Sequence, residues 1–109
     1  MFRIFTTEEF DKDFNTLDKS EQIRIKKIRE QLENQGDLVG RTLSGLSFFR
    51  EKRLNGKRMY FLVYRDILVI LLLAIGGKKA QKATINRILL DLAEYQQYVF
   101  ETLKKKSIT

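Results

Sequence analysis

Residues 49–60 read FREKRLNGKRMY, and this stretch decides how the rest of the chain is interpreted. Strand-forming residues flank the pair Asn55-Gly56, which is a strong sequence signal for a two-residue β-hairpin loop of type I′. Five of the twelve residues are cations. A β-hairpin does not need that much positive charge to fold, so the charge requires a separate explanation.

The hairpin loop also determines which residues face one another, because pairing runs outward from the two loop residues. Arg53 is expected opposite Arg58, and Glu51 opposite Tyr60. Since side chains alternate along a strand, these four residues share one face. The other face is expected to belong to the core, and it carries Leu54, Met59, Phe61 and Val63.

Arg53 and Arg58 would then be two like charges directly across a strand pair, an arrangement that destabilises a sheet. A phosphate between them relieves the repulsion, because guanidinium groups bind phosphate oxygens in pairs. Glu51 can offset part of the repulsion in the free protein. The sequence therefore predicts that Arg53 and Arg58 form an anion clamp.

The elements outside the hairpin predict a single α+β domain over residues 1–109. We expect a small antiparallel sheet of about four strands, packed against an N-terminal helical hairpin, with a long C-terminal helix, in the order β-α-α-β-β-β-α. The Gly-rich stretch 36–47 is expected to be the main loop. The predicted strands are 2–5, 48–54, 57–65 and 67–75, and the predicted last helix runs from residue 81 or 84 to about 104.

Two capping boxes mark the helical hairpin. Thr6 followed by Glu9 predicts a helix that begins immediately after Thr6. Asp18 followed by Glu21 predicts a second helix, which Gly36 is placed to end. Both helices carry mixed charges, which is typical of a scaffold that covers a sheet.

Composition excludes several classes of chemistry. The chain has 109 residues with no Cys and no His, which removes disulfides, thiolate nucleophiles and the usual general base and zinc ligand. No cofactor or metal is expected.

The longest apolar run, residues 67–75, is too short to span a membrane and is better interpreted as a buried strand. We expect a cytoplasmic protein that makes no membrane contact.

The positive charge is concentrated in one part of the chain. Residues 41–82 hold ten Lys or Arg and two acids, whereas the remaining chain holds eleven Lys or Arg and twelve acids. Such a patch is typical of polyanion binding, although a solvated basic surface has the same composition. The segment GGKK (76–79) places Lys78 and Lys79 at the end of the last strand, where they are either phosphate ligands or plain surface charge.

The order of elements and three short motifs resemble the RelE/ParE toxin superfamily, and most closely its RelE- and HigB-like addiction-module killer proteins. The segment RTLSGLSFFREKRL (41–54) is similar to the family pattern K-L-x-G … E-x-R. The segment GKRMYF (56–61) is similar to Y-R-V-Y-F, and GGKKAQ (76–81) to K-K-x-Q. The resemblance spans nearly the whole chain and implies a small antiparallel sheet covered by helices.

The resemblance also implies roles for individual residues. Arg58 matches the arginine that contacts the scissile phosphate, Arg53 the basic residue of the preceding strand, and Lys79 or Lys78 the basic residue after the last strand. Tyr60 or Glu51 would stack on a base or accept a proton, since the position near Ile85 carries no Tyr or His. Further phosphate contacts are expected from Arg50, Lys52, Lys57, Lys78, Gln81 and Lys82.

Three functions stay open at this point. The first is a ribosome-dependent mRNA endonuclease of a type II toxin–antitoxin module. It would enter the ribosomal A site and cut mRNA there without a metal. The second is a ParE-like inhibitor of DNA gyrase with no nuclease activity. The third is an inactive basic RNA-binding module. For a toxin, the resemblance implies a small, acidic antitoxin that wraps the basic face and forms a hetero-oligomer with it.

Overall fold

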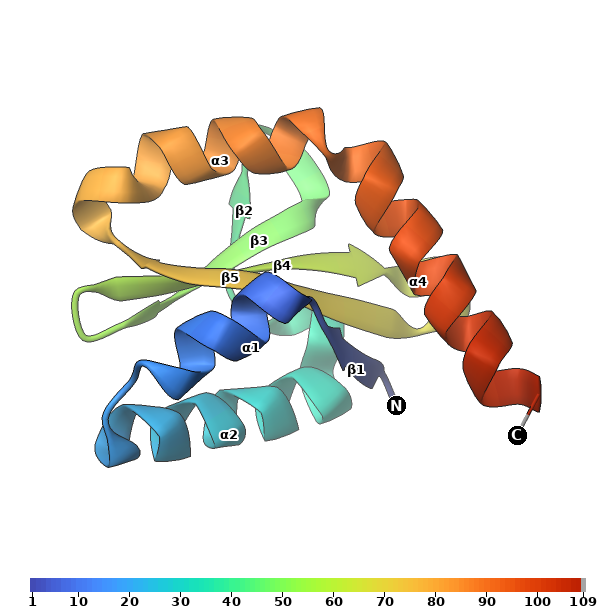
Figure 1. The fold of residues 1–109 in the computed structure, drawn as a ribbon, viewed down its shortest axis with the longest axis horizontal. Coiled ribbons are helices and arrows are strands. Elements are labelled where there is room, and N and C mark those ends of the chain that lie inside the picture. The colour runs from blue at the N-terminus through green and yellow to red at the C-terminus, as the bar shows by residue number, and fades with distance from the viewer. Residues whose placement is uncertain (109) are drawn as a thin grey trace. The chain divides into compact units, whose positions relative to one another are not determined.

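The computed structural model contains a mixed five-stranded sheet and describes residues 1–108 apart from the side chains of residues 37, 107 and 108 (Figure 1). The described chain divides into two units, Met1–Lys78 and a second unit from Lys79 onward. The first unit holds the sheet and two helices, and the second holds the C-terminal helices. The α+β class predicted from the sequence is confirmed.

The strands are β1 (Arg3–Thr6), β2 (Arg41–Leu43), β3 (Leu46–Leu54), β4 (Lys57–Tyr64) and β5 (Val69–Gly77). They are ordered β1-β5-β4-β3-β2 across the sheet. Strand β1 pairs with β5 in parallel, and the other pairs are antiparallel. The predicted antiparallel sheet of about four strands therefore gains a fifth strand and one parallel pair. The parallel pair depends on contacts between residues far apart in the sequence, which local patterns do not reveal.

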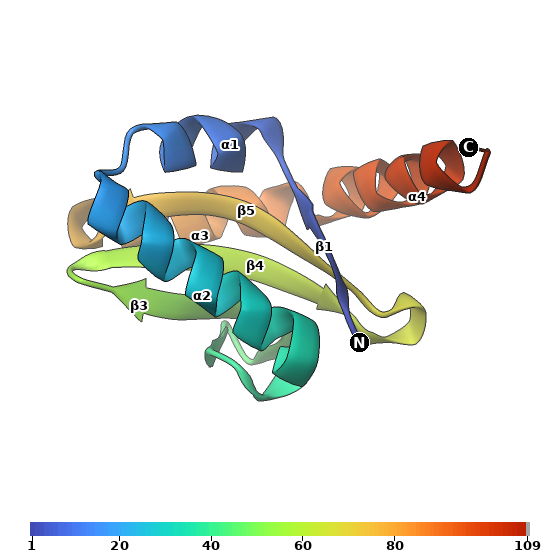
Figure 2. The ribbon, with the colours of Figure 1, turned by 90° about the horizontal axis from the view of Figure 1, so that it is seen from below.

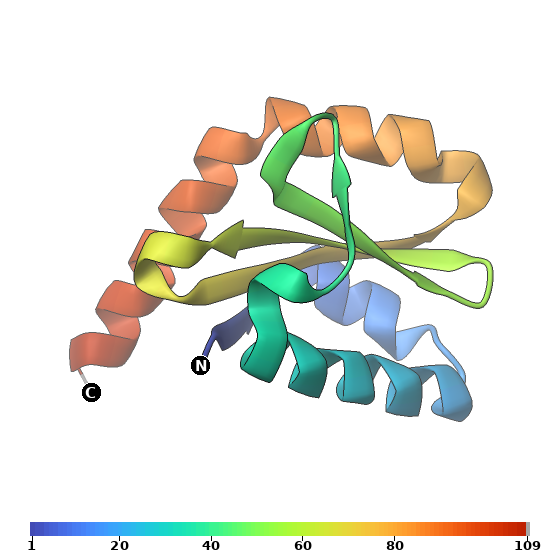
Figure 3. The same cartoon turned by 180° about the vertical axis from the view of Figure 1, so that it is seen from behind.

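Strand β2 lies inside the segment that the sequence predicted as the main loop. A 3₁₀ turn at Gly36–Leu38 leads into it, and β2 then doubles back on β3 at the edge of the sheet (Figure 3). Glycines lie on both sides of this three-residue strand. Because glycines are typical of loops, the pairing of β2 with β3 was not predicted. The expectation of a loop over 36–47 was wrong for residues 41–43 and for the start of β3.

Helices α1 (Glu8–Asn15) and α2 (Lys19–Gln35) lie together on one face of the sheet (Figure 2). The helix caps are local in origin. Asp18 and Glu21 form the predicted capping box, and the backbone N–H of Gly36 ends α2 by donating to the carbonyl of Leu32. The first helix starts one residue later than predicted, because Thr7 and not Thr6 is its N-cap.

Thr7 is the better cap because its hydroxyl has two partners. The hydroxyl oxygen accepts the N–H of Phe10 at 3.0 Å and donates to the carbonyl of Leu73 in β5 at 2.8 Å. Asp13 makes a second link, since its carboxylate accepts the backbone N–H of Ile75 at 2.9 Å. Both links fall just beyond the last residue of β5 that pairs with β1, which is Leu72. The α1 region thus satisfies backbone groups that β1 does not reach.

The core of the first unit lies between α1, α2 and the sheet. Apolar side chains from both layers form one cluster there. The sheet supplies alternate residues of β4, as expected for a strand with one face in the core. The buried members of the cluster are Phe10, Leu17, Ile25, Ile28, Leu32, Val39, Leu54, Met59, Phe61, Val63, Ile70, Leu72 and Ile75.

The second unit contains α3 (Gln81–Leu90) and α4 (Leu92–Ile108) where the sequence predicted one long helix. The break falls at Asp91, whose backbone is not helical and whose N–H bonds the carbonyl of Ile88. Aspartate is a poor helix former, because its carboxylate competes for nearby backbone groups. The apolar periodicity continues through the break, so a pattern of hydrophobic residues alone does not detect it.

Candidate functional site

The β3–β4 hairpin has the predicted register. Arg53 pairs with Arg58, Glu51 with Tyr60, and Leu54 with Lys57. Asn55 and Gly56 both have positive φ angles, 44° and 76°, as a type I′ turn requires. The prediction that two arginines face one another across this hairpin is confirmed.

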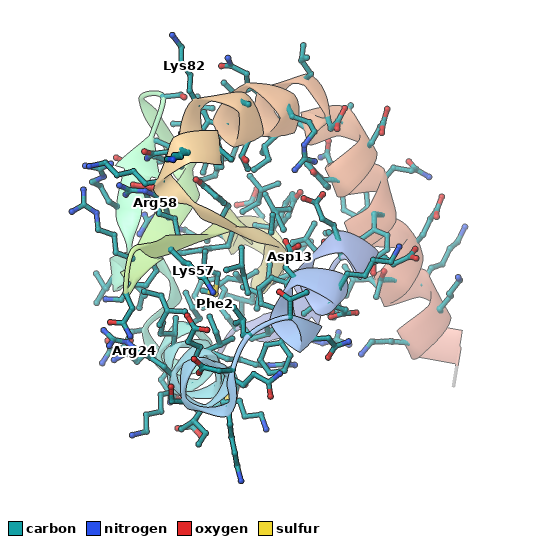
Figure 4. The ribbon with its side chains drawn as sticks, turned by 60° about the vertical axis from the view of Figure 1, so that its left-hand side comes forward. Phe2, Asp13, Arg24, Lys57, Arg58 and Lys82 are labelled. Carbon is teal, nitrogen blue, oxygen red and sulfur yellow. The ribbon has the colours of Figure 1, made fainter. Side chains whose placement is uncertain are left out.

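Side-chain alternation assigns the two arginines to the sheet face that points away from α1 and α2. Leu54 and Met59 belong to the core cluster under these helices, so their strand neighbours Arg53 in β3 and Arg58 in β4 point to the other side. Figure 4 shows the same alternation along β4, where Lys57 extends toward α2 and Arg58 lies on the opposite side of the sheet. We call Arg41, Glu51, Arg53 and Arg58 the arginine–glutamate cluster.

Glu51 is the centre of the cluster. Its Oε1 atom lies 2.6 Å from Nη2 of Arg41 and 3.4 Å from Nη1 of Arg58. The side chains of Glu51 and Arg58 are almost fully buried, at 1% and 8% exposed, whereas that of Arg41 is 61% exposed. A buried carboxylate thus links one buried and one exposed guanidinium on neighbouring strands.

Arg53 is the exposed member of the hairpin pair, and no carboxylate neutralises it among the ion pairs of the described residues. The cluster therefore holds three guanidinium groups and one carboxylate. This leaves a net positive charge on the sheet face, in a setting that is partly shielded from water. Electrostatic attraction of an anion is stronger there than on an open surface.

Two buried polar atoms of the region have no hydrogen-bond partner within the described part of the chain, namely Nε of Arg58 and the hydroxyl oxygen of Tyr60. Buried polar groups are usually paired, and exceptions are common at functional sites. Burial raises the pKa of Tyr60, the negative charge of Glu51 raises it further, and Arg58 opposes the rise. The Tyr60 phenol is therefore protonated at neutral pH, when it is a proton donor and not a base.

A shallow depression of about 300 Å³ opens beside the cluster and is lined by Gly40, Arg41, Glu51, Lys52 and Arg53. Gly40 brings β2 close to β3 at this point. Its φ angle is +81°, and a Cβ atom there would lie 2.6 Å from the backbone oxygen of Glu51. Glycine at this position therefore allows Arg41 to reach the Glu51 carboxylate.

Arg58 also has space on its other side. Its partner in β5 is Gly76, which has no side chain, and a Cβ atom added there would meet nothing within 4 Å. The glycine pair Gly76-Gly77 forms the end of β5, since the strand runs to Gly77.

Among the other predicted phosphate ligands of the first unit, Arg50 and Lys57 have partners outside the cluster. Arg50 is buried, and its guanidinium donates to the carbonyls of Ser47 at 2.9 Å and Val39 at 3.4 Å. The bond to Val39 fastens the chain before β2 to β3. Lys57 pairs with Glu21 of α2 at 3.1 Å. Lys52 shares the strand face of Leu54 and is half-buried, although it lines the depression.

The remaining predicted residues follow β5. Lys78 and Lys79 are exposed in a 3₁₀ turn, Lys78–Ala80, and Gln81 and Lys82 form the start of α3. Lys78 belongs to the first unit, and the other three belong to the second. Their roles stay predictions.

Arg41 is the residue of the cluster that the sequence-based site did not include. Its segment was interpreted as loop, so its partner across the sheet was not predictable. The only signal was its place at the start of the motif RTLSG, at residues 41–45. In the structure it is opposite Glu51 in the β2–β3 register.

Among the side chains that the structure describes, which exclude that of residue 37, no group of three acidic, His or Cys residues is arranged to hold a metal ion. No helix within residues 1–108 combines the length and apolar character needed to cross a bilayer.

Comparison with known proteins identifies the fold. No family model matches the sequence, and no curated protein matches it. Solved structures do match. The isolated RelE toxin of E. coli has a TM-score of 0.64 and 16% identity, with 81% of this chain and 99% of that chain covered. The RelE–RelB complex of the archaeon Pyrococcus horikoshii has a TM-score of 0.63 and 20% identity, with 71% and 94% covered.

A third match is the RelB–RelE antitoxin–toxin complex of Methanococcus jannaschii, with a TM-score of 0.60, 19% identity, and 73% and 96% of the two chains covered. The matched proteins are thus covered almost completely. The chain is an α+β protein with the fold of the RelE toxins. The resemblance noted in the sequence is therefore confirmed for the fold.

Proposed function

We propose that this chain is the toxin of a type II toxin–antitoxin module and acts as a ribosome-dependent endonuclease of mRNA. The RelE fold supports the toxin assignment. The observation that carries the nuclease assignment is the opposition of Arg53 and Arg58 on the sheet face that points away from α1 and α2. Guanidinium groups bind phosphate oxygens in bidentate fashion, so two opposed arginines favour binding of a phosphodiester.

The proposed reaction needs no metal. The 2′-OH of a ribose attacks the adjacent phosphorus, the 2′-O–P bond forms, and the P–O5′ bond breaks. The products are a 2′,3′-cyclic phosphate and a 5′-OH. Arg53 and Arg58 stabilise the additional negative charge of the pentacoordinate transition state. Donors held in place before the reaction are effective, because they need no reorganisation as charge develops.

Proton transfer completes this reaction. The 2′-OH proton must be accepted and the 5′ oxygen must be protonated. Glu51 is the carboxylate nearest to the arginine pair and is the proposed acceptor, while Tyr60, whose raised pKa keeps it protonated at neutral pH, is the proposed donor. Lys79 and Lys78 are proposed as further phosphate ligands.

The toxin assignment includes a partner. Several of the matched structures are complexes of RelE with RelB. We propose a small acidic antitoxin for this chain, because the net charge of +7 favours an acidic protein. Toxin and antitoxin would meet in the cytoplasm, where the ribosome and mRNA are found. Co-expression of a neighbouring acidic reading frame should abolish toxicity and yield a co-purifying complex.

The test of the nuclease is primer extension on translated mRNA after induction of the wild type, Arg58→Ala and Arg53→Ala. The wild type should arrest growth and produce new 5′ ends within codons. Each arginine variant should cleave about 10²–10³-fold more slowly, the usual loss of one transition-state donor. Lys12→Ala is the charge-matched control, since Lys12 is an exposed residue of α1, in contact with Glu8.

Two outcomes would replace the proposal. Growth arrest with intact mRNA and inhibited gyrase supercoiling would assign a ParE-like inhibitor. Salt-sensitive RNA binding with neither arrest nor cleavage would assign an inactive RNA-binding module. Full activity of Arg58→Ala would reject the arginine clamp.

A further inference from the structure

A single oxygen atom of Glu51 is shared by two guanidinium groups at unequal distances. Oε1 is 2.6 Å from Nη2 of Arg41 and 3.4 Å from Nη1 of Arg58. Charge-assisted N–H···O bonds usually measure about 2.7–2.9 Å. The contact with Arg41 is therefore a full ionic hydrogen bond, and the contact with Arg58 is a long one.

The long contact leaves hydrogen-bonding capacity on Arg58. Its Nε–H has no partner among the described residues, although the side chain is buried. A carboxylate drawn fully onto Arg58 would form a bidentate pair, which is the preferred geometry of this combination. Such a pair would occupy the N–H groups that a phosphate needs.

We propose that Arg41 is a positioning residue: it draws Glu51 off Arg58 and so keeps the Arg58 guanidinium available to the RNA phosphate. This role rests on the proposed function of the site. In this role, Arg41 and Arg58 compete for the same oxygen atom of Glu51. Removal of Arg41 lets Glu51 close on Arg58, and the incoming phosphate must then displace an ion pair.

Arg41 suits this role because of its place in the fold. It stands opposite Glu51 in the β2–β3 register, and Gly40 allows the close approach of the two strands. Arg58 lies on β4, on the other side of Glu51. The carboxylate therefore sits between the two guanidinium groups, one on each neighbouring strand. Arg41 acts on Arg58 only through the charge of Glu51, which separates this role from direct contact with RNA.

The test is a double-mutant cycle with wild type, Arg41→Ala, Glu51→Gln and the double variant. Binding of a fluorescent RNA oligonucleotide with 2′-O-methyl riboses, which cannot be cleaved, is measured by anisotropy at one fixed salt concentration. Arg41→Ala should weaken binding about tenfold in the wild-type background, the loss expected for one charge-assisted hydrogen bond. In the Glu51→Gln background it should weaken binding no more than Lys12→Ala does, because no carboxylate remains to close on Arg58.

An equal loss in the two backgrounds would overturn the role, since it would mean that Arg41 touches RNA directly. Arg41→Lys should keep most of the affinity, because an ammonium group still attracts Glu51. If Glu51→Gln fails to fold, the Nε–H resonance of Arg58 gives the answer in Arg41→Ala alone. Titration with inorganic phosphate should shift this NMR signal in the wild type and much less in Arg41→Ala, and an equal shift in both would refute the role.

Failure of the proposed function has a different signature. If mRNA stays intact after induction, while the cycle shows the expected dependence on Glu51, the nuclease assignment is wrong and the role of Arg41 in anion binding stands. If mRNA is cleaved and the cycle is additive, the nuclease assignment stands and the role of Arg41 is rejected.

Discussion

Arg53 and Arg58 are directly opposed across the β3–β4 hairpin, but their environments differ. The side chain of Arg58 is buried beside the carboxylate of Glu51, whereas Arg53 is exposed at the rim of the depression. The repulsion between the two arginines is thus reduced by the carboxylate of Glu51 and by the solvent around Arg53. The two arginines should therefore respond differently to mutation, although they share one proposed task.

Arg53→Ala should leave stability nearly unchanged and remove activity. An exposed surface substitution usually alters the free energy of unfolding by less than about 0.5 kcal/mol. Removal of one of two opposed cations also relieves repulsion. Urea denaturation should show an unchanged or slightly raised midpoint, while cleavage of translated mRNA falls by about 10²–10³-fold. A clear loss of stability would show that Arg53 has a structural partner.

Glu51→Ala should destabilise the fold strongly. It leaves the buried guanidinium of Arg58 without its nearest countercharge, and loss of one partner of a buried ion pair typically costs about 3–5 kcal/mol. Glu51→Gln should cost less, because an amide oxygen still accepts a hydrogen bond. Chemical denaturation measures both. A cost below about 1 kcal/mol for Glu51→Ala would show that the pair behaves like an exposed salt bridge.

Tyr60 gives a pH prediction. Its pKa is raised in the folded protein, mainly by burial, so the unfolded chain releases the phenolic proton at lower pH than the folded chain does. The protonated phenol of Tyr60 therefore contributes stability to the folded protein below the ordinary pKa of about 10. This contribution is lost as pH rises through the pKa of Tyr60 in the folded protein. Ultraviolet difference titration of wild type against Tyr60→Phe should show one tyrosine that ionises above the ordinary pKa.

Tyr60→Phe should also affect stability at neutral pH. The hydroxyl is buried without a hydrogen-bond partner in the described chain, and its removal should stabilise the fold by roughly 1 kcal/mol. If mRNA cleavage falls at the same time, Tyr60 donates a proton in the reaction. Unchanged cleavage would restrict Tyr60 to a structural role.

Gly40→Ala should disrupt the approach of β2 to β3. Alanine at φ +81° is strained by about 1–3 kcal/mol, and its Cβ would meet the backbone oxygen of Glu51. Lower thermal stability together with reduced RNA affinity is the expected result. Gly45→Ala is the matched control, because Gly45 also has a positive φ but has open space around it. Equal effects on RNA affinity would show that backbone strain alone is responsible.

The sequence predicted those features of the site that depend on local geometry. The register of Arg53 and Arg58 follows from two loop residues, and the start of α2 follows from Asp18 and Glu21. The place of Arg41 beside Glu51 depends on a three-residue strand inside a Gly-rich segment, where propensity carries little information. The shift of the first helix cap from Thr6 to Thr7 depends on a carbonyl of β5, which lies far away in the sequence. Non-local pairing decided these two features, whereas the helix break at Asp91 is local but leaves the apolar periodicity unchanged.

The attachment of the α1 region to β5 has a consequence for solubility. Strand β1 ends its pairing at Leu72, and beyond it β5 would present backbone groups to other molecules. The hydroxyl of Thr7 and the carboxylate of Asp13 bind two of these groups, at Leu73 and Ile75. A strand this apolar with an open border is a template for intermolecular β-aggregation. The side chains of Thr7 and Asp13 therefore help to protect the folded protein from aggregation through the edge of β5.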